Sequence, residues 1–210
     1  MAKSSKKDSS EKAQKVPSSF VDKNATPKMD ANNHSKYQPT SDAVASTQLL
    51  DDKDQVLKLF TDSVKDLYWA ENHLLKALPK MINAASFDKL KQAITKHLKQ
   101  TKEHVARLEN VFELLSVPPT ARKCDAMEGL TKEGEGVIEC TEPDSIARNL
   151  GIIMASQKVE HYEISSYTGL GNLAEMLELP EIAQLLAQTL AEEQEADDTL
   201  SSLADEMELN

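Results

Sequence analysis

The chain has 210 residues, a formal net charge of −11, and aromatic residues at only 4%. This length allows one domain of about 150 residues with an appended segment. An acidic chain is a poor match for nucleic acid phosphates, and no run of roughly 18 apolar residues predicts a membrane span, so nucleic acid and membrane partners are both disfavoured. The first 15 residues are basic, but no apolar stretch follows them, so we expect a cytoplasmic protein.

The composition divides the chain near residue 48. Residues 1–48 contain eight lysines against five acidic residues and many Ser, Asn, Thr and Pro, which predicts a disordered tail. A flexible DNA-binding arm is the alternative, weakly supported by this small positive charge. Residues 49–210 carry 16 basic against 30 acidic residues and form the predicted helical domain. Its two cysteines, Cys124 and Cys140, have no metal-binding or redox spacing and are expected to be reduced.

The first predicted helix covers residues 49–84. Its apolar positions recur at alternating spacings of three and four, which defines a buried seam. Glu71 occupies one slot of that seam, where a leucine would be expected. A buried carboxylate is costly unless a cation or hydrogen bonds compensate its charge. The apolar members of the seam are Leu57, Phe60, Val64, Leu67, Leu74, Leu78 and Met81.

The second predicted helix covers residues 89–116, with Ser86 or Asp88 as a plausible N-cap. Its seam contains His97, Thr101 and His104, and Gln100 flanks the same face. A long connection follows over residues 117–143. We expect a short helix within it, at about 125–140, weakened by three glycines.

The third and fourth long helices are predicted from residue 144 to 178 and from Pro180 onward. Glu160 and Glu163 lie on one side of the third helix, and Glu193 and Asp197 on one side of the fourth. Gly169 and Gly171 predict an irregularity in the third helix. Two helical hairpins joined by one long connection are typical of a ferritin-like four-helix bundle.

Counting residues outward from the turn of each hairpin shows which residues of its two helices lie side by side. Glu71 then lies level with residue 99, beside Gln100, and Glu163 lies level with residue 195. Whether both hairpins share one level stays open. Carboxylates that face one another in a core repel strongly without cations, so one or two divalent ions such as iron or manganese are predicted.

The simpler alternative for each polar residue is a solvated helix face or an ordinary hydrogen bond. Glu160 and Glu163 could pair with Lys158 or Arg148, and the two seam histidines could be plain bundle residues. Glu103, Glu192 and Glu195 are assigned to the solvated face. The coincidence of carboxylates on three seams favours the metal site.

At these same residues the sequence resembles the bacterial YciE/YciF proteins. The similar stretches include the run from Asp66 to Glu71 and the run from Gln157 to Tyr167. Others are Ala77–Met81, Lys123–Leu130 and Leu190–Asp197, so that the resemblance extends over about residues 50–205. It implies a ferritin-like fold, a homodimer and an association with stress responses.

The resemblance also implies a ligand set. The family's dimetal ligands fall on Glu71, Glu160, Glu163, Glu193 and Asp197. Members of the family have Glu-Thr where this chain has Gln100-Thr101. Gln100 supplies only a neutral oxygen, which weakens a second metal position, although His104 could compensate. His97 and His161 are expected behind the ligands, as partners that orient them.

Two functions follow as hypotheses. The first is a stress-associated protein that binds one or two iron or manganese ions, with Fe(II) oxidation or peroxide reduction as its possible chemistry. The second is a structural or interaction protein, a helical dimer that keeps the fold with a degraded metal site. Gln100 is the residue that favours the second hypothesis.

Overall fold

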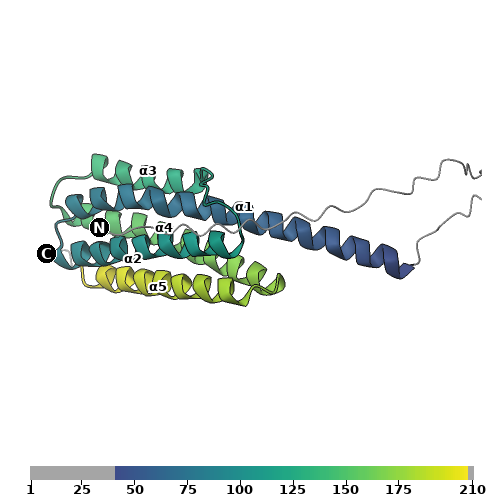
Figure 1. The fold of residues 1–210 in the computed structure, drawn as a ribbon. Helices are drawn as coiled ribbons and strands as arrows, with labels where there is room; N and C mark the ends of the chain where they lie inside the picture. Colours follow the sequence, from purple (N-terminus) through teal and green to yellow (C-terminus); the bar gives the residue numbers. More distant parts are fainter. Residues whose placement is uncertain (1–40, 208–210) are drawn as a thin grey trace, which may run out of the picture. The chain divides into compact units, whose positions relative to one another are not determined.

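The computed structural model describes residues 41–207, with side chains from residue 51 onward. The regular secondary structure of this part of the chain is all helix (Figure 1). Four long helices surround one core, and a short fifth helix lies in the long connection, as predicted. The helices are α1 (Ser41–Ala84), α2 (Asp88–Leu114), α3 (Asp125–Cys140), α4 (Ile146–Met176) and α5 (Pro180–Asp205).

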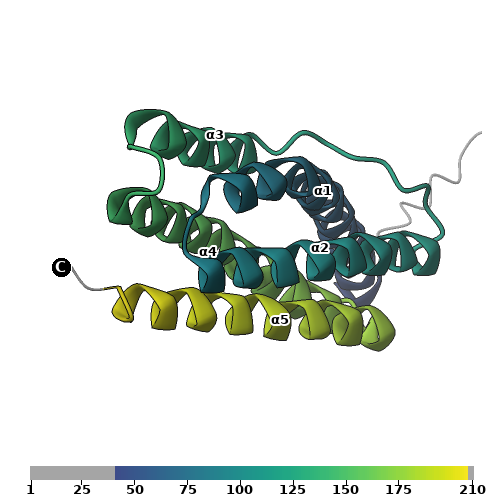
Figure 2. The ribbon, with the colours of Figure 1, turned by 90° about the vertical axis from the view of Figure 1, so that its left-hand side faces the viewer.

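The long helices form two antiparallel hairpins, α1–α2 and α4–α5, each closed by a turn of three residues. The hairpins pack together through α1 against α4 and α2 against α5, while α3 covers α1 and α4 (Figure 2). The connection between α2 and α4 returns the chain along the bundle. The predicted ferritin-like arrangement with one long crossover is therefore confirmed.

Two local expectations need correction. Helix α1 begins at Ser41, eight residues before the predicted start, in a stretch where Ala43 and Ala45 favour helix. The rest of the predicted tail lies outside the described residues. Helix α4 runs without interruption through Gly169 and Gly171. Each glycine costs about 1 kcal/mol of helix propensity, a loss that burial of the neighbouring apolar side chains offsets.

The start of α2 is held by α4 rather than by its own cap. Its N-cap residue is Phe87, which makes no side-chain cap hydrogen bond, so the predicted Ser86 or Asp88 cap is wrong. Instead Asn149 Oδ1 accepts hydrogen bonds from the backbone N–H groups of Ser86 and Phe87, at 2.9 and 3.1 Å. This buried side chain joins the two hairpins and fixes their relative level.

The short helix α3 approaches its neighbours closely at Gly134. A Cβ atom there would lie 2.8 Å from Met81 Cε of α1, closer than real contacts allow. Because Met81 Cε is the end of a flexible side chain, a larger residue at 134 would require only that side chain to move. At the start of the helix the Cys124 sulfur accepts a hydrogen bond from Met127 N, and both cysteines are free.

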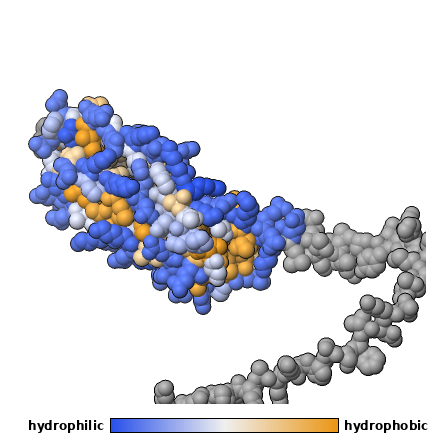
Figure 3. Space-filling view, turned by 45° about the horizontal axis from the view of Figure 1, so that its top comes forward, coloured by the Kyte–Doolittle hydropathy of each residue, from blue (hydrophilic) through white to orange (hydrophobic). Residues whose placement is uncertain are grey.

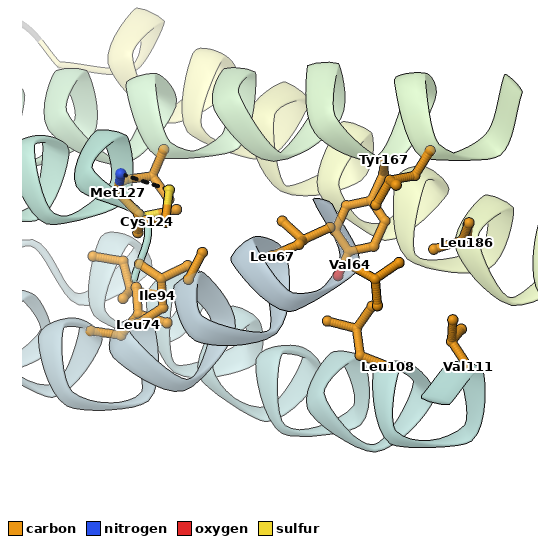
Figure 4. Close-up of a cluster of buried hydrophobic side chains, with 14 of the residues drawn as sticks. Val64, Leu67, Leu74, Ile94, Leu108, Val111, Cys124, Met127, Tyr167 and Leu186 are labelled. Atoms are coloured by element: carbon orange, nitrogen blue, oxygen red, sulfur yellow. Dashed lines mark hydrogen bonds between the residues drawn. The ribbon is translucent and has the colours of Figure 1, made fainter. Parts of the chain in front are cut away.

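Apolar side chains fill the core on both sides of the level of Glu71. Figure 4 shows Leu74, Ile94 and Met127 in one group, and Val64 and Tyr167 in the other. The face drawn in Figure 3 is mainly hydrophilic with apolar patches between. Among the described residues no helix has the length and apolar character that a membrane crossing requires.

Candidate metal centre

A layer of carboxylates lies inside the bundle between the apolar groups. Glu71 of α1, Glu163 of α4 and Glu193 of α5 are fully buried, and Glu160 is 2% exposed. Glu71 lies one turn from Leu67 and Leu74, and Glu163 lies one turn from Val159, and all three apolar side chains are buried. The helix periodicity therefore carries the carboxylates into the core, and both hairpins contribute at one level.

Helix α2 supplies two histidines to this layer. His97 lies between α4 and α5, with Nε2 3.7 Å from Glu160 Oε1 and Nδ1 3.7 Å from Glu193 Oε2. His104, two turns later on the same face, has Nδ1 2.9 Å from Glu193 Oε1 and 3.5 Å from Glu71 Oε1. Both residues are at most 5% exposed.

Most polar atoms of this layer have no hydrogen-bond partner. Ten buried side-chain nitrogen and oxygen atoms in the described part of the chain are unsatisfied, and all belong to seven residues of this one region. His104 Nδ1 and Glu193 Oε1 are both in this set although they lie 2.9 Å apart, a distance at which a protonated ring would form an ion pair with the carboxylate. The seven residues are Glu71, His97, His104, Glu160, Glu163, Glu193 and Asp197.

Protons partly neutralise the layer when no cation is bound. Burial and the neighbouring carboxylates hold the pKa values of Glu160 and Glu163 well above the usual range. Burial also raises the pKa of Glu71, although His104 opposes it. Burial would lower the pKa of His104, but its contacts with Glu193 and Glu71 raise it to about 10. Glu193 is buried too, yet His104 keeps its pKa low.

His97 differs from His104 in this respect. Burial lowers its pKa, and Glu193 does not compensate fully. Neither ring nitrogen of His97 has a hydrogen-bond partner among the described residues. A neutral imidazole with a free lone pair is the form that binds a metal.

Two groups of these residues could hold a metal ion. In one, donor atoms of Glu71, His104 and Glu193 all lie within 4.8 Å of one another. In the other, donor atoms of His97, Glu160, Glu163 and Glu193 meet the same limit. Glu193 belongs to both groups, so its two oxygens are placed to serve adjacent positions. Carboxylates with imidazoles are a donor set that suits iron, manganese and zinc.

The remaining predicted residues lie at the edge of the layer. Gln100 is half-buried and lines a cavity of about 30 Å³ beside His97 and Glu160, which is large enough to hold a water molecule. Asp197 has one oxygen buried without a partner, and its other oxygen lies 3.1 Å from Nε2 of His161. The His161 side chain is 68% exposed. These three residues stay predictions, nearer to solvent than the others.

The surface pairs considered for Glu160 and Glu163 are not formed. Lys158 instead contacts Glu133 of α3. Arg148 donates hydrogen bonds to the backbone carbonyls of Ile138 and Thr141, at the end of the same short helix. The two carboxylates therefore have no basic partner from these positions.

Sequence reasoning missed the residues around the layer. Tyr167 is buried and donates a 2.5 Å hydrogen bond to Glu71 Oε1. Its signal was its place one turn after Glu163 on the same seam. Glu192, assigned to the solvated face, accepts hydrogen bonds from Arg107 and contacts His104. Packing α2 against α5 would have placed His104, Arg107 and Glu192 at the same level along the bundle.

A ferritin-like bundle with carboxylates and histidines from four helices in its core is the class that this fold and site define. The chain belongs to the family described as "Domain of unknown function (DUF892)", which matches residues 55–209. It is similar to Protein YciF of Escherichia coli K12, with 44% identity over 147 residues, 70% of this chain and 88% of YciF. The family predicted from the residues is thereby confirmed.

Solved structures agree with this assignment. The crystal structure of the E. coli stress protein YciF matches with a TM-score of 0.69 and 42% identity, over 71% of this chain and 94% of that one. The structure of YcfI from Rhodopseudomonas palustris matches with a TM-score of 0.67 and 35% identity, over 73% of this chain and 95% of that one. A Xanthomonas campestris protein matches with a TM-score of 0.57 and 22% identity, over 72% of this chain and 91% of that one. At this identity the match supports the fold alone.

Proposed function

We propose that this chain binds one or two divalent ions of the iron or manganese class in the core of its bundle. The observation that carries the proposal is the set of ten unsatisfied polar atoms in one buried layer. Each such atom costs about 1–3 kcal/mol, more if charged, and a folded domain is stable by only about 5–15 kcal/mol. A bound cation would satisfy many of them at once.

Two positions are available to the ions. Glu71 and His104 would hold one, and His97, Glu160 and Glu163 the other, with Glu193 between them. A bound iron or manganese ion would supply the redox chemistry that oxidant handling requires. A role under stress is supported by the description of the E. coli relative as a stress protein, and a cytoplasmic location remains our expectation.

The test is retention of metal by the full chain. Wild type, Glu193→Ala and Glu195→Ala are loaded with Fe(II) or Mn(II) without oxygen, desalted and assayed for bound metal. Glu195 is the matched control, because it lies on the same helix with its side chain 60% exposed. We expect retention by wild type and Glu195→Ala only. Equal retention by wild type and Glu193→Ala would refute the proposal.

The second candidate is a structural helical protein with a degraded metal site. It is favoured by Gln100, a neutral side chain beside His97 and Glu160 at a position where a carboxylate would be expected of a complete ligand set. On this alternative wild type retains no metal, while Gln100→Glu restores binding. The same loading experiment therefore separates the two functions.

We also propose a homodimer. Large apolar side chains lie exposed on the described surface, among them Leu59 at 57%, Met154 at 60% and Met176 at 68%. Single exposed apolar residues are common, but apolar residues that join into one patch mark protein contacts, and the proposal requires that these side chains do so across the dimer. Sedimentation of the full chain at several concentrations would give the mass of a dimer. A monomer at every concentration would contradict this part of the proposal.

A further inference from the structure

His104 contacts a carboxylate at each of its ring nitrogens. Nδ1 faces the buried layer, 2.9 Å from Glu193 and 3.5 Å from Glu71. Nε2 points the opposite way and lies 2.8 Å from Glu192 Oε2. Glu192 is only partly covered, with 27% of its side chain exposed, and it belongs to neither candidate metal group. The ring therefore lies between the buried layer and a carboxylate nearer the surface.

Arg107 fixes the orientation of that outer carboxylate. Its guanidinium donates to both oxygens of Glu192, at 2.7 and 2.8 Å, and also to Thr189 Oγ1 at 3.1 Å. A bidentate pair of this kind defines the plane of the carboxylate as well as its distance. Arg107 lies one turn after His104 on α2, whereas Glu192 and Thr189 lie on α5. The pair therefore holds the two helices together beside the ring.

This arrangement selects one form of the imidazole. Glu192 Oε2 accepts a hydrogen bond from Nε2, so Nε2 keeps its hydrogen, and the nitrogen that a metal ion would deprotonate and bind is Nδ1, which faces Glu71 and Glu193. His97 is the internal contrast, because neither of its nitrogens has a partner. Of the two buried histidines, only His104 has an orienting acceptor.

We propose that Glu192, held by Arg107, is the positioning residue that presents His104 Nδ1 to a metal ion. This inference rests on the proposed function and names a residue outside the ligand set. Partners of this kind change metal affinity by about 10–100-fold when they are removed. The effect is local to one histidine, so it can be separated from a general loss of structure.

The test uses Zn(II) as a diamagnetic probe on the full chain labelled with ¹⁵N. Zinc affinity is measured by competition with a chelator, and long-range ¹H–¹⁵N spectra show which His104 nitrogen is bound. Wild type should bind zinc through Nδ1 and show a slowly exchanging Nε2–H. Glu192→Ala should bind about 10–100-fold more weakly and lose that slow exchange. Glu192→Gln keeps an accepting oxygen and should recover most of the affinity.

The controls separate the possible failures. Glu195→Ala should behave like wild type in both measurements. Unchanged zinc affinity and an unchanged Nε2–H signal in Glu192→Ala would overturn the positioning role alone, whereas no zinc binding by wild type would overturn the metal site as well. If Glu192→Ala does not fold by circular dichroism, Arg107→Lys gives the same test, because lysine keeps the charge but loses the bidentate contact. Arg107→Lys should bind zinc more weakly than wild type does. If the variant bound zinc as tightly as wild type, the positioning role would be refuted.

Discussion

Glu163 offers a direct measure of what the carboxylate layer costs the fold. It is fully buried, and neither of its oxygens has a partner among the described residues. Its raised pKa, caused by burial and by nearby carboxylates, keeps it protonated over much of the range in which glutamate is normally ionised. Glu163→Met fills a similar volume without polar atoms. Removing one unsatisfied buried group should stabilise the metal-free protein by about 1–3 kcal/mol.

Thermal unfolding with and without metal tests this reasoning. For a domain of this size, the change should raise Tm by about 3–10 °C in the presence of a chelator. Mn(II) at 1,000 times its Kd should reverse the order, because it stabilises wild type by about 4.1 kcal/mol, more than the variant gains, while the variant lacks a donor. Glu195→Met is the surface control. A metal-free Glu163→Met that is less stable than wild type would show that the layer satisfies its own polar groups.

Four further outcomes follow from the same layer. The raised pKa values of Glu160, Glu163 and His104 mean that the folded state binds more protons than the unfolded state, so metal-free stability should fall as pH rises from 5 toward 8. The lowered pKa of His97 opposes this trend only in part. Urea unfolding at several pH values measures the trend, and a stability that rose with pH would contradict the prediction. Metal affinity should rise over the same range, because ions displace these protons, as a pH series of chelator competitions would show. Gln100→Glu should increase the metal bound per chain, and unchanged stoichiometry would place residue 100 outside the site. Tyr167→Phe removes the hydrogen bond to the carboxylate of α1 and should weaken metal binding by less than Glu193→Ala; equal losses would make the hydroxyl a ligand in its own right.

The fold could be predicted because its signals are periodic. Seam positions such as Val64 and Leu74 recur at helix spacing, and a turn of three residues leaves a hairpin little freedom. The start of α2 could not be predicted in the same way. Its backbone donors are satisfied by Asn149, which lies about 60 residues later in the chain, and no local pattern identifies such a partner.

The candidate site shows the same division. Glu71, Glu160, Glu163 and Glu193 stood out because a carboxylate in an apolar seam is anomalous within its own helix. Glu192 does not stand out, since it lies one step off the seam and looks like any solvated glutamate. Its contact with His104 depends on how α2 and α5 face each other, and this is a property of the packing rather than of either helix.

The pattern of loss argues against a degraded site. Replacing a buried unpaired carboxylate with an apolar residue is often neutral or stabilising, so a layer without a ligand would be expected to lose its fully buried members first. The family resemblance predicts a glutamate at Gln100, which is only half-buried, while Glu71, Glu163 and Glu193 are 0% exposed. The costly carboxylates are present, and the neutral residue lies where a carboxylate would cost less. That distribution is what a working site with altered affinity at one position would show, and metal stoichiometry in wild type and Gln100→Glu decides it.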